Sequence, residues 1–235
     1  MSVIYFNCRS GISGDMVVGS LLDLGTEIEY LARELSKMHL SGYSVFARKV
    51  NKMGVAATKF DVAVEGNQPQ RNLSDISLII EESSLARKVK DLSQDIFLNL
   101  GRSEALAHHT SIEKVHFHEV GCVDSIIDIV SAAILLNKLN VAEVYCGTVS
   151  LGRGSARTEH GILEIPTFVV RDLLKDAPTS LTEISAELTT PTGAAILNAC
   201  VKKYIEKPPE KGRTGYGAGL LDLERPNVLS ALINP

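Results

Sequence analysis

Two imidazoles and three carboxylates fall within thirteen residues near the middle of the chain: His116, His118, Glu119, Asp124 and Asp128. Imidazole and carboxylate groups together suit a first-row divalent cation. His116 and His118 alternate with one intervening residue, so at a strand end both rings would share one face. We therefore predict a metal site with His116, His118, Asp124 and Asp128 as ligands.

An apolar segment, Ile129–Leu136, follows these polar residues directly. A helix that is apolar on all sides is normally buried, and we predict such a helix over about 125–139. A carboxylate on its first turns must be paired, bound to a metal or at the protein's edge, because burying a lone carboxylate is costly. Asp124 is a natural N-cap, and Asp128 lies one turn further on the same side. The ordinary alternative is that Asp124 only caps and Asp128 only favours the helix dipole.

A glycine-rich turn follows the first apolar run, Val3–Phe6, and leads into a helix that Ser13 can cap. The backbone N–H groups at such a helix start can hold an anion, so Gly11, Ser13 and Gly14 are candidate binding residues. Asp15 instead suits a cation or a cation-bridged phosphate, and we assign it a role in the reaction. A tight turn with a capping serine is the structural alternative.

A second helix start has a similar character. Thr190 is a good N-cap, and Pro191 is a good first helical residue. The free N–H groups there, with the hydroxyls of Thr189, Thr190 and Thr192 and the backbone of Gly193, form another candidate anion site. An ordinary helix cap is the alternative interpretation.

Composition narrows the function classes. The chain has 235 residues and a formal net charge of −4, without a cluster of Lys and Arg, which argues against nucleic-acid binding. It has no apolar run of membrane-spanning length and no signal-peptide pattern at its start, so a cytoplasmic location is expected. The four cysteines form no CxxC pair, so free thiols are expected. A soft-metal role for Cys8 and Cys122, which lie beside the two motif regions, is the alternative.

The order of elements predicts an α+β fold, with a mixed sheet, helices packed on it and a central buried helix. A polar loop over 66–72 indicates a subdivision there. Other helices are expected at 15–24, 27–38 (capped by Thr26), 73–82, 85–107, 166–174 (opened by Pro166) and 191–203. Strands are expected at 43–50 and 55–65, which form a hairpin, and at 141–151, 212–219 and 226–233. The glycines of 212–219 indicate an element packed closely against that strand.

Several separated motifs together resemble the LarC family of nickel insertion proteins. The resemblance extends from the first strand to about Val228, and its HFHEVG and GISGDM strings are specific. The motifs are Ser10–Met16, His116–Gly121 with Val123–Asp128, His160–Gly161, Glu187–Ala195, and Gly215–Gly219 with Arg225–Val228.

The resemblance implies a nickel chelatase (cyclometallase) of the lyase class. It would insert nickel into pyridinium-3,5-bisthiocarboxylic acid mononucleotide while CTP is hydrolysed. His118 or Glu119 would remove the pyridinium C–H proton as the Ni–C bond forms. The nucleotide phosphate would bind at 11–15 or at 189–193. Full-length members carry a further C-terminal domain, so 1–235 would be the N-terminal domain, and CTP with Mn or Mg is expected only with that separate domain.

The sequence differs from the family pattern at two places, and two other functions are possible interpretations of the same residues. Many relatives have a His-rich loop where this chain has Gln68–Arg71, and a Pro-rich run where Leu163–Phe168 has one proline. The rivals are a nickel chaperone that does no chemistry and a metal-dependent phosphohydrolase that uses Asp15 and the histidines. A homo-oligomer is left open, and the isolated chain can be inactive without its partner domain.

Overall fold

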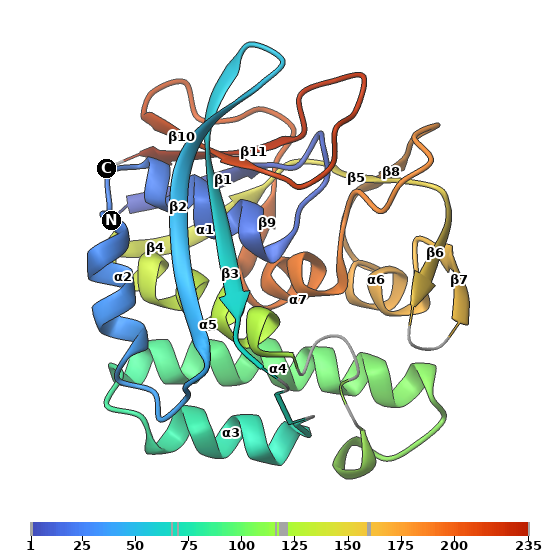
Figure 1. Ribbon diagram of the computed structural model, residues 1–235. Helices are drawn as coiled ribbons and strands as arrows, with labels where there is room; N and C mark the ends of the chain where they lie inside the picture. Colours follow the sequence, from blue (N-terminus) through green and yellow to red (C-terminus); the bar gives the residue numbers. More distant parts are fainter. Residues whose placement is uncertain are drawn as a thin grey trace.

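The computed structural model describes residues 2–66, 68–69, 71–115, 117, 122–158 and 161–234. Its main sheet is mixed and confirms the α+β class. The strands of this sheet are β1 (Ser2–Asn7), β2 (Tyr43–Lys52), β3 (Val55–Val64), β4 (Val141–Cys146), β9 (Val201–Tyr204), β10 (Arg213–Ala218) and β11 (Val228–Asn234). Their order is β2-β3-β10-β11-β1-β4-β9 (Figure 1). β1 runs antiparallel to β11 and parallel to β4, so it is an interior strand of the sheet.

Two small ribbons stand apart from this sheet. They pair β5 (Val149–Leu151) with β8 (Thr179–Leu181), and β6 (Gly154–Thr158) with β7 (Gly161–Ile165). The predicted strand over 141–151 is therefore two strands, because the chain leaves β4 for a different sheet after Cys146. The predicted subdivision at 66–72 includes Asn67 and Gln70, which lie outside the described residues, and stays a prediction.

The helices cover one face of the main sheet in layers (Figure 1). They are α1 (Gly14–Asp23), α2 (Ile28–Leu35), α3 (Leu73–Glu82), α4 (Arg87–Ala107), α5 (Val123–Lys138), α6 (Phe168–Leu173) and α7 (Pro191–Cys200), with a short 3-10 helix η1 (Ile112–Lys114). α1, α5 and α7 lie nearest the strands, α4 packs on α5 and α7, and α3 packs on α4. Among the residues described, no helix is both long and apolar enough to cross a membrane.

The central buried helix is confirmed as α5. Eleven of its sixteen residues are buried, including Ile126, Ile127 and Val130 with no exposed surface. It contacts α1, α2, α4, α7 and β3, so apolar neighbours surround it as its all-round apolar sequence requires. Each buried Ile or Leu contributes about 1.5–3 kcal/mol relative to an exposed position.

Glycines allow α1 to approach β10 unusually closely. A Cβ on Gly217 would lie 1.9 Å from the Met16 carbonyl oxygen, and one on Gly215 would lie 2.2 Å from the Ser20 carbonyl oxygen. Both obstacles are backbone atoms of α1, which cannot rotate away as a side chain can. The expectation that an element packs closely on this strand is confirmed, and α1 is that element.

Several predicted helix ends are wrong. α2 begins after Glu27 rather than at a Thr26 cap. Pro166 follows a cis peptide bond, and α6 begins only after Thr167, whose hydroxyl accepts the Val170 N–H at 3.4 Å. α7 ends at Cys200, because the next residues pair with β4 as strand β9 and satisfy their backbone groups there.

None of the four cysteines is in a disulfide, as predicted. The sulfurs of Cys8 and Cys146 lie 3.5 Å apart, and both residues are fully buried. Burial raises the pKa of the Cys8 thiol well above its usual value. Since the thiolate is the form that binds metals, Cys8 is a poor soft-metal ligand here. Cys122 is exposed.

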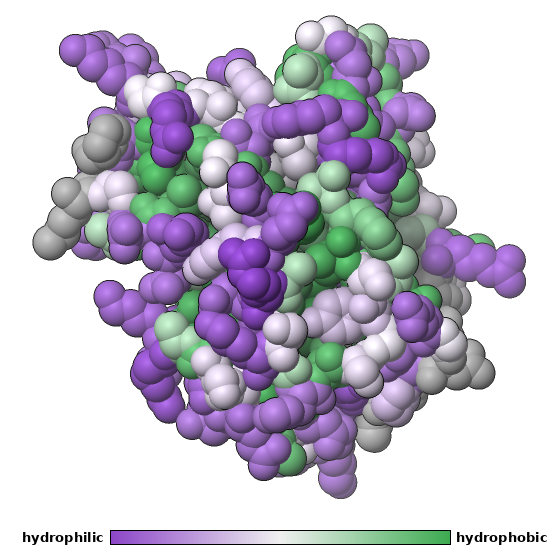
Figure 2. Space-filling view, turned by 60° about the vertical axis from the view of Figure 1, so that its left-hand side comes forward, coloured by the Kyte–Doolittle hydropathy of each residue, from purple (hydrophilic) through white to green (hydrophobic). Residues whose placement is uncertain are grey.

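The surface carries both hydrophilic and hydrophobic residues. Figure 2 shows hydrophilic residues interspersed with areas of hydrophobic residues over one face of the molecule. A few large apolar side chains are well exposed, among them Met53, Ile162 and Leu220. Single exposed apolar residues are normal on protein surfaces, so they carry no functional conclusion by themselves.

We expect Asp23→Ala to destabilise the fold, because Asp23 ties the end of α1 to three strands, β2, β3 and β10. Its carboxylate accepts hydrogen bonds from the Lys49 ammonium, from the Thr58 hydroxyl at 2.6 Å and from the Tyr216 N–H at 2.8 Å. Burial acts to raise the pKa of Asp23, but these hydrogen bonds outweigh it and lower the pKa. The expected loss at neutral pH is about 2 kcal/mol, the range for hydrogen bonds to charged groups.

The loss of stability in Asp23→Ala is expected to be larger at neutral pH than at acidic pH. Because the folded-state pKa is lowered, the stability that the carboxylate supplies is present above the unfolded-state pKa and is lost as pH falls through the folded-state value. Urea unfolding at neutral and acidic pH measures both effects. Asp91→Ala, which breaks an exposed pair with Arg87, is the control and should change stability by less than about 0.5 kcal/mol. Equal effects of Asp23→Ala at both pH values would contradict this account.

Candidate functional site

A pocket of about 510 Å³ opens where α1, α5 and β3 meet the segments before α7 and after β10. Its described walls hold five carboxylates and one ammonium. The residues that line it are Ser13, Gly14, Asp15, Met16, Lys59, Phe60, Asp61, Val62, Asp124, Asp128, Glu187, Leu188, Thr190, Gly219, Leu220, Leu221 and Asn227. Two of the predicted regions, at 11–15 and 189–193, therefore contribute to one pocket with the start of α5.

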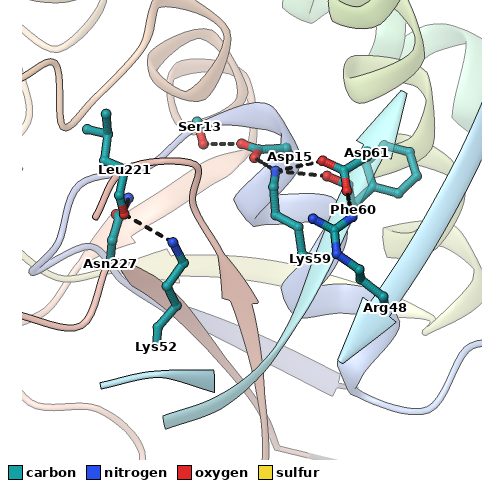
Figure 3. Close-up of polar contacts among 9 residues, drawn as sticks. All are labelled: Ser13, Asp15, Arg48, Lys52, Lys59, Phe60, Asp61, Leu221 and Asn227. Atoms are coloured by element: carbon teal, nitrogen blue, oxygen red, sulfur yellow. Dashed lines mark hydrogen bonds and ion pairs between the residues drawn. The ribbon is translucent and has the colours of Figure 1, made fainter. Parts of the chain in front are cut away.

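The first turn of α1 brings Asp15 to the pocket. Ser13 occupies the N-cap position, but its hydroxyl donates to the Asp15 carboxylate and makes no hydrogen bond to a backbone N–H. The expected side-chain cap by Ser13 is therefore wrong. The other oxygen of Asp15 forms an ion pair with the ammonium of Lys59 (Figure 3). Asp15 is thus held from two sides, with 23% of its side chain exposed.

The first turns of α5 bring Asp124 and Asp128 to the same pocket, as their spacing predicts. The N-cap of α5 is Cys122, so the expected capping role of Asp124 is wrong. Asp124 lies in the first turn, and its Oδ1 accepts the Ser125 N–H at 2.9 Å.

The environment of Asp128 disfavours its charged form. Burial raises its pKa well above the ordinary value, and the neighbouring carboxylates of Asp15 and Asp124 add to this effect. Lys59 and the Asp15 N–H act in the opposite direction but do not offset it. No side chain in the described part of the chain donates a hydrogen bond to Asp128. A carboxyl in this position would gain from a cation in the pocket.

Gly14 allows the two helices to come together at the pocket. A Cβ on Gly14 would lie 2.4 Å from Oδ2 of Asp128 and 2.7 Å from its Cβ. Any larger residue would therefore separate the start of α1 from α5. The role of Gly14 in the structure is to let Asp15 and Asp128 face one pocket.

Lys59 was missed by the sequence interpretation. It lies on β3, where an alternating pattern predicts that charged side chains face solvent, yet only 6% of the residue is exposed. Its ammonium pairs with Asp15, lies 3.4 Å from the Asp61 carboxylate and donates to the Phe60 carbonyl oxygen at 3.0 Å (Figure 3). The missing information is the packing of α1 over β3, which no local pattern encodes.

The start of α7 is joined to the start of α1 through the backbone. Ile12 donates its N–H to the Leu188 carbonyl at 2.9 Å, and Thr190 donates its N–H to the Ile12 carbonyl at 3.0 Å. Thr190 is the N-cap, as predicted, and its hydroxyl accepts the Gly193 N–H at 3.2 Å. The two predicted anion sites therefore lie side by side.

Only some of the predicted binding residues line the pocket. Ser13, Gly14, Asp15 and Thr190 do so. Gly11, Thr189, Thr192 and Gly193 are not among its lining residues. They shape the backbone instead: Thr189 donates its hydroxyl to the Ser150 carbonyl at 2.9 Å, and a Cβ on Gly193 would lie 2.3 Å from the Ile12 carbonyl oxygen. Gly11 has φ +82°, and its Cβ would lie 1.9 Å from the Leu188 carbonyl oxygen.

His116, His118 and Glu119 lie outside the described residues, so their roles stay predictions. Phe117 between them is buried and is not assigned to a strand. Within the described ranges, no three His, Cys, Asp or Glu side chains come close enough together to hold a metal ion.

Comparison with known protein families shows to which family the chain belongs. The profile of the family described as nickel insertion protein matches residues 4–235, which is nearly the whole chain. The chain belongs to this family. The pocket between α1, α5 and β3 is thus a pocket of a nickel insertion family member. Part of each motif lines it, namely Ser13–Met16 of GISGDM and the two aspartates of VDSIID, Asp124 and Asp128.

Individual relatives agree with the family assignment. The chain is 42% identical over 231 residues to the pyridinium-3,5-bisthiocarboxylic acid mononucleotide nickel insertion protein of Desulfitobacterium hafniense, covering 97% of the chain and 57% of that protein. It is 42% identical over 245 residues to the protein of the same name in Geobacillus kaustophilus, covering 99% of the chain and 60% of that protein.

A third relative, from Citrifermentans bemidjiense, bears a name that assigns it provisionally to nickel insertion. It is 44% identical over 236 residues, which are 99% of the chain and 61% of that protein. The chain therefore spans about three-fifths of the length of the curated relatives it matches. No solved structure matches the chain.

Proposed function

We propose that this chain takes part in inserting nickel into pyridinium-3,5-bisthiocarboxylic acid mononucleotide. The observation that carries the proposal is the convergence of Asp15 from α1 and Asp128 from α5 on one pocket of a nickel insertion family member. Relatives at 42% identity bear that activity in their names. On this account the protein is a nickel chelatase, and nickel is the ion it delivers rather than a resident cofactor.

The proposed metal ligands combine described and undescribed residues. Asp124 and Asp128 line the pocket, and His116 and His118 precede α5 directly in the sequence. Such oxygen and imidazole ligands suit nickel without trapping it, because an excess of thiolates would bind it too tightly for transfer. His118 or Glu119 is the proposed base for the pyridinium C–H proton, since both can titrate in a useful range.

The phosphate of the nucleotide is proposed to bind at the paired starts of α1 and α7. The backbone joins these two segments, and a helix start offers unpaired N–H groups to an anion. Thr190 supplies a hydroxyl on the pocket wall. The carboxylates of the pocket would repel a bare phosphate, so the metal is expected to bind before or together with the nucleotide.

We further propose that residues 1–235 act as one domain together with a separate C-terminal domain of the family. CTP with Mn or Mg would bind to that domain, and self-association of this chain stays a prediction. The support is the greater length of the relatives, because the chain covers only 57–61% of it.

The deciding experiment measures nickel binding and precursor conversion separately. Nickel affinity is measured by calorimetry on the chain alone, and conversion is measured with the C-terminal domain of the Desulfitobacterium relative supplied in trans. Conversion only with the domain present supports the proposal. Nickel binding without conversion under any condition would favour a chaperone, and phosphate release from the nucleotide without nickel would favour a phosphohydrolase.

We expect Asp124→Asn to weaken nickel binding by about tenfold or more without destabilising the fold. Asp124 is exposed and lies at the edge of the pocket, so losing its charge removes a ligand but no buried contact. Calorimetry with nickel and urea unfolding measure the two properties. Asp91→Asn, on the exposed face of α4, is the control for a changed net charge. Unchanged nickel affinity would remove Asp124 from the proposed ligand set.

A further inference from the structure

We propose that Lys59 is an internal counter-cation that nickel must displace from Asp15, so that Lys59 keeps nickel binding weak enough for transfer. This inference rests on the proposed function, because it concerns the same pocket. It adds a residue that the sequence motifs do not contain. The role is one of positioning and affinity control, since Lys59 acts through Asp15.

The geometry of Lys59 carries the inference. Its side chain is only 8% exposed, so its ammonium depends on protein partners in place of water. Those partners are the Asp15 carboxylate, the Asp61 carboxylate at 3.4 Å and the Phe60 carbonyl oxygen at 3.0 Å. Figure 3 shows the ammonium between the two carboxylates, which come from different elements, α1 and β3. A cation of the chain itself therefore lies on this side of the pocket, bound to Asp15.

The charges around the pocket explain why this cation competes with a metal. Among the described wall residues, Lys59 is the only Lys, Arg or His, and it shares the wall with five carboxylates: Asp15, Asp61, Asp124, Asp128 and Glu187. A divalent ion bound by Asp15 would lie beside the Lys59 ammonium and repel it at short range. The ion can bind fully to the Asp15 carboxylate only when the ion pair between Lys59 and Asp15 breaks. Part of the binding free energy of nickel is thus spent on breaking that pair, which lowers its affinity.

A transfer protein needs such a device. A site that only attracts nickel would retain it, whereas a tethered ammonium that returns to Asp15 helps the metal leave toward the substrate. The alternative is that Lys59 holds an anionic group of the nucleotide. The contacts argue against this alternative, because two carboxylates and a carbonyl oxygen already surround the ammonium.

The test compares nickel affinity in four forms of the chain: wild type, Lys59→Met, Asp15→Asn and the double variant. Lys59→Met keeps the length of the side chain and removes its charge. It is expected to tighten nickel binding by about 5- to 150-fold, the range of ordinary coupling between sites. The gain is expected to vanish in the Asp15→Asn background, where there is no ion pair to break. Precursor conversion by Lys59→Met, with the C-terminal domain supplied, is expected to fall because release slows.

Lys52→Met is the matched control. It removes the same charge from the neighbouring strand, where Lys52 donates to the Leu221 carbonyl at 3.2 Å (Figure 3). Lys52 also pairs with Asp222 at 2.7 Å. It should leave nickel affinity within about twofold of wild type, since its ion-pair partner Asp222 is 93% exposed and neither residue lines the pocket. Circular dichroism and thermal melting check the fold of each variant. If Lys59→Met does not fold, Lys59→Gln, which keeps a hydrogen-bond donor, replaces it in the same cycle.

The outcomes separate this inference from the proposed function. If the wild type binds nickel and Lys59→Met leaves that affinity unchanged or weakens it, the inference is overturned. The proposed function is not affected by this result. Lower affinity of Lys59→Met for the nucleotide alone, with unchanged nickel affinity, would assign the ammonium to the substrate instead. Binding by Lys59→Met but not by wild type would support the inference strongly. No binding by either form would overturn both the metal centre and the inference.

Discussion

Gly217→Ala is expected to lower the free energy of unfolding by about 3 kcal/mol, at the upper end of the usual cost of overpacking. The new methyl group would lie 1.9 Å from the Met16 carbonyl oxygen and 2.6 Å from the Ser20 nitrogen. Both atoms belong to the backbone of α1, so the helix as a whole must move away from β10. α1 also carries Asp15, and we therefore expect nickel affinity to fall together with stability.

Urea unfolding followed by circular dichroism measures this loss of stability. Gly101→Ala is the control, because Gly101 lies in the interior of helix α4 and its Cβ would meet only side chains, at 3.3 Å or more. There the better helix propensity of alanine, worth up to about 1 kcal/mol, should offset the tight contact. Equal unfolding midpoints for wild type and Gly217→Ala would mean that α1 and β10 are not packed as described.

Asp128→Asn is expected to have opposite effects on stability and on nickel binding. The pKa of Asp128 is raised, chiefly by burial and then by Asp15 and Asp124. A raised folded-state pKa means that this group favours folding below the unfolded-state pKa and loses that contribution as pH rises through the folded-state value. At neutral pH the carboxyl therefore destabilises the metal-free protein. Asparagine removes this cost, so the melting temperature should stay the same or rise.

Nickel binding by Asp128→Asn should fall by about 10- to 100-fold, because a partly buried carboxylate that faces the pocket is lost. Calorimetry and thermal melting on the same preparation measure the two effects. Asp61→Asn is an informative comparison, since Asp61 also lines the pocket but pairs with Arg48 and Lys59 and should therefore lose stability. A parallel fall in melting temperature and affinity in Asp128→Asn would indicate a structural carboxylate rather than a metal ligand.

Much of the fold was predictable because local pattern and tertiary packing agree. The apolar sequence of α5 predicted its burial, and the glycines of β10 predicted a close neighbour. The errors lie at element ends, where several local solutions compete. Residues 201–204 can continue a helix or form a strand, and pairing with β4 decides the matter. Cys122 rather than Asp124 is the N-cap of α5, although aspartate is the better N-cap by its chemistry.

The site was predictable only where its residues belong to motifs. The spacing of Asp124 and Asp128 placed both on one side of α5, and the Gly11–Asp15 turn was recognised as a helix start. Lys59 could not be found in this way, because its burial depends on α1 covering β3 from far along the chain. The link between Ile12 and Thr190 also required the structure, since it joins segments almost 180 residues apart.

β1 pairs with β11, and this pairing limits how early the main sheet can form during synthesis. β1 is an interior strand of the sheet, and its Val3 pairs with Asn234 on β11. At a synthesis rate of about 5–20 residues per second, β1 waits on the order of ten to fifty seconds for this partner. Until then the apolar strand has an unpaired edge that another nascent chain can join. Expression of the chain should therefore benefit from a lower temperature or from chaperones that cover its first strand during synthesis.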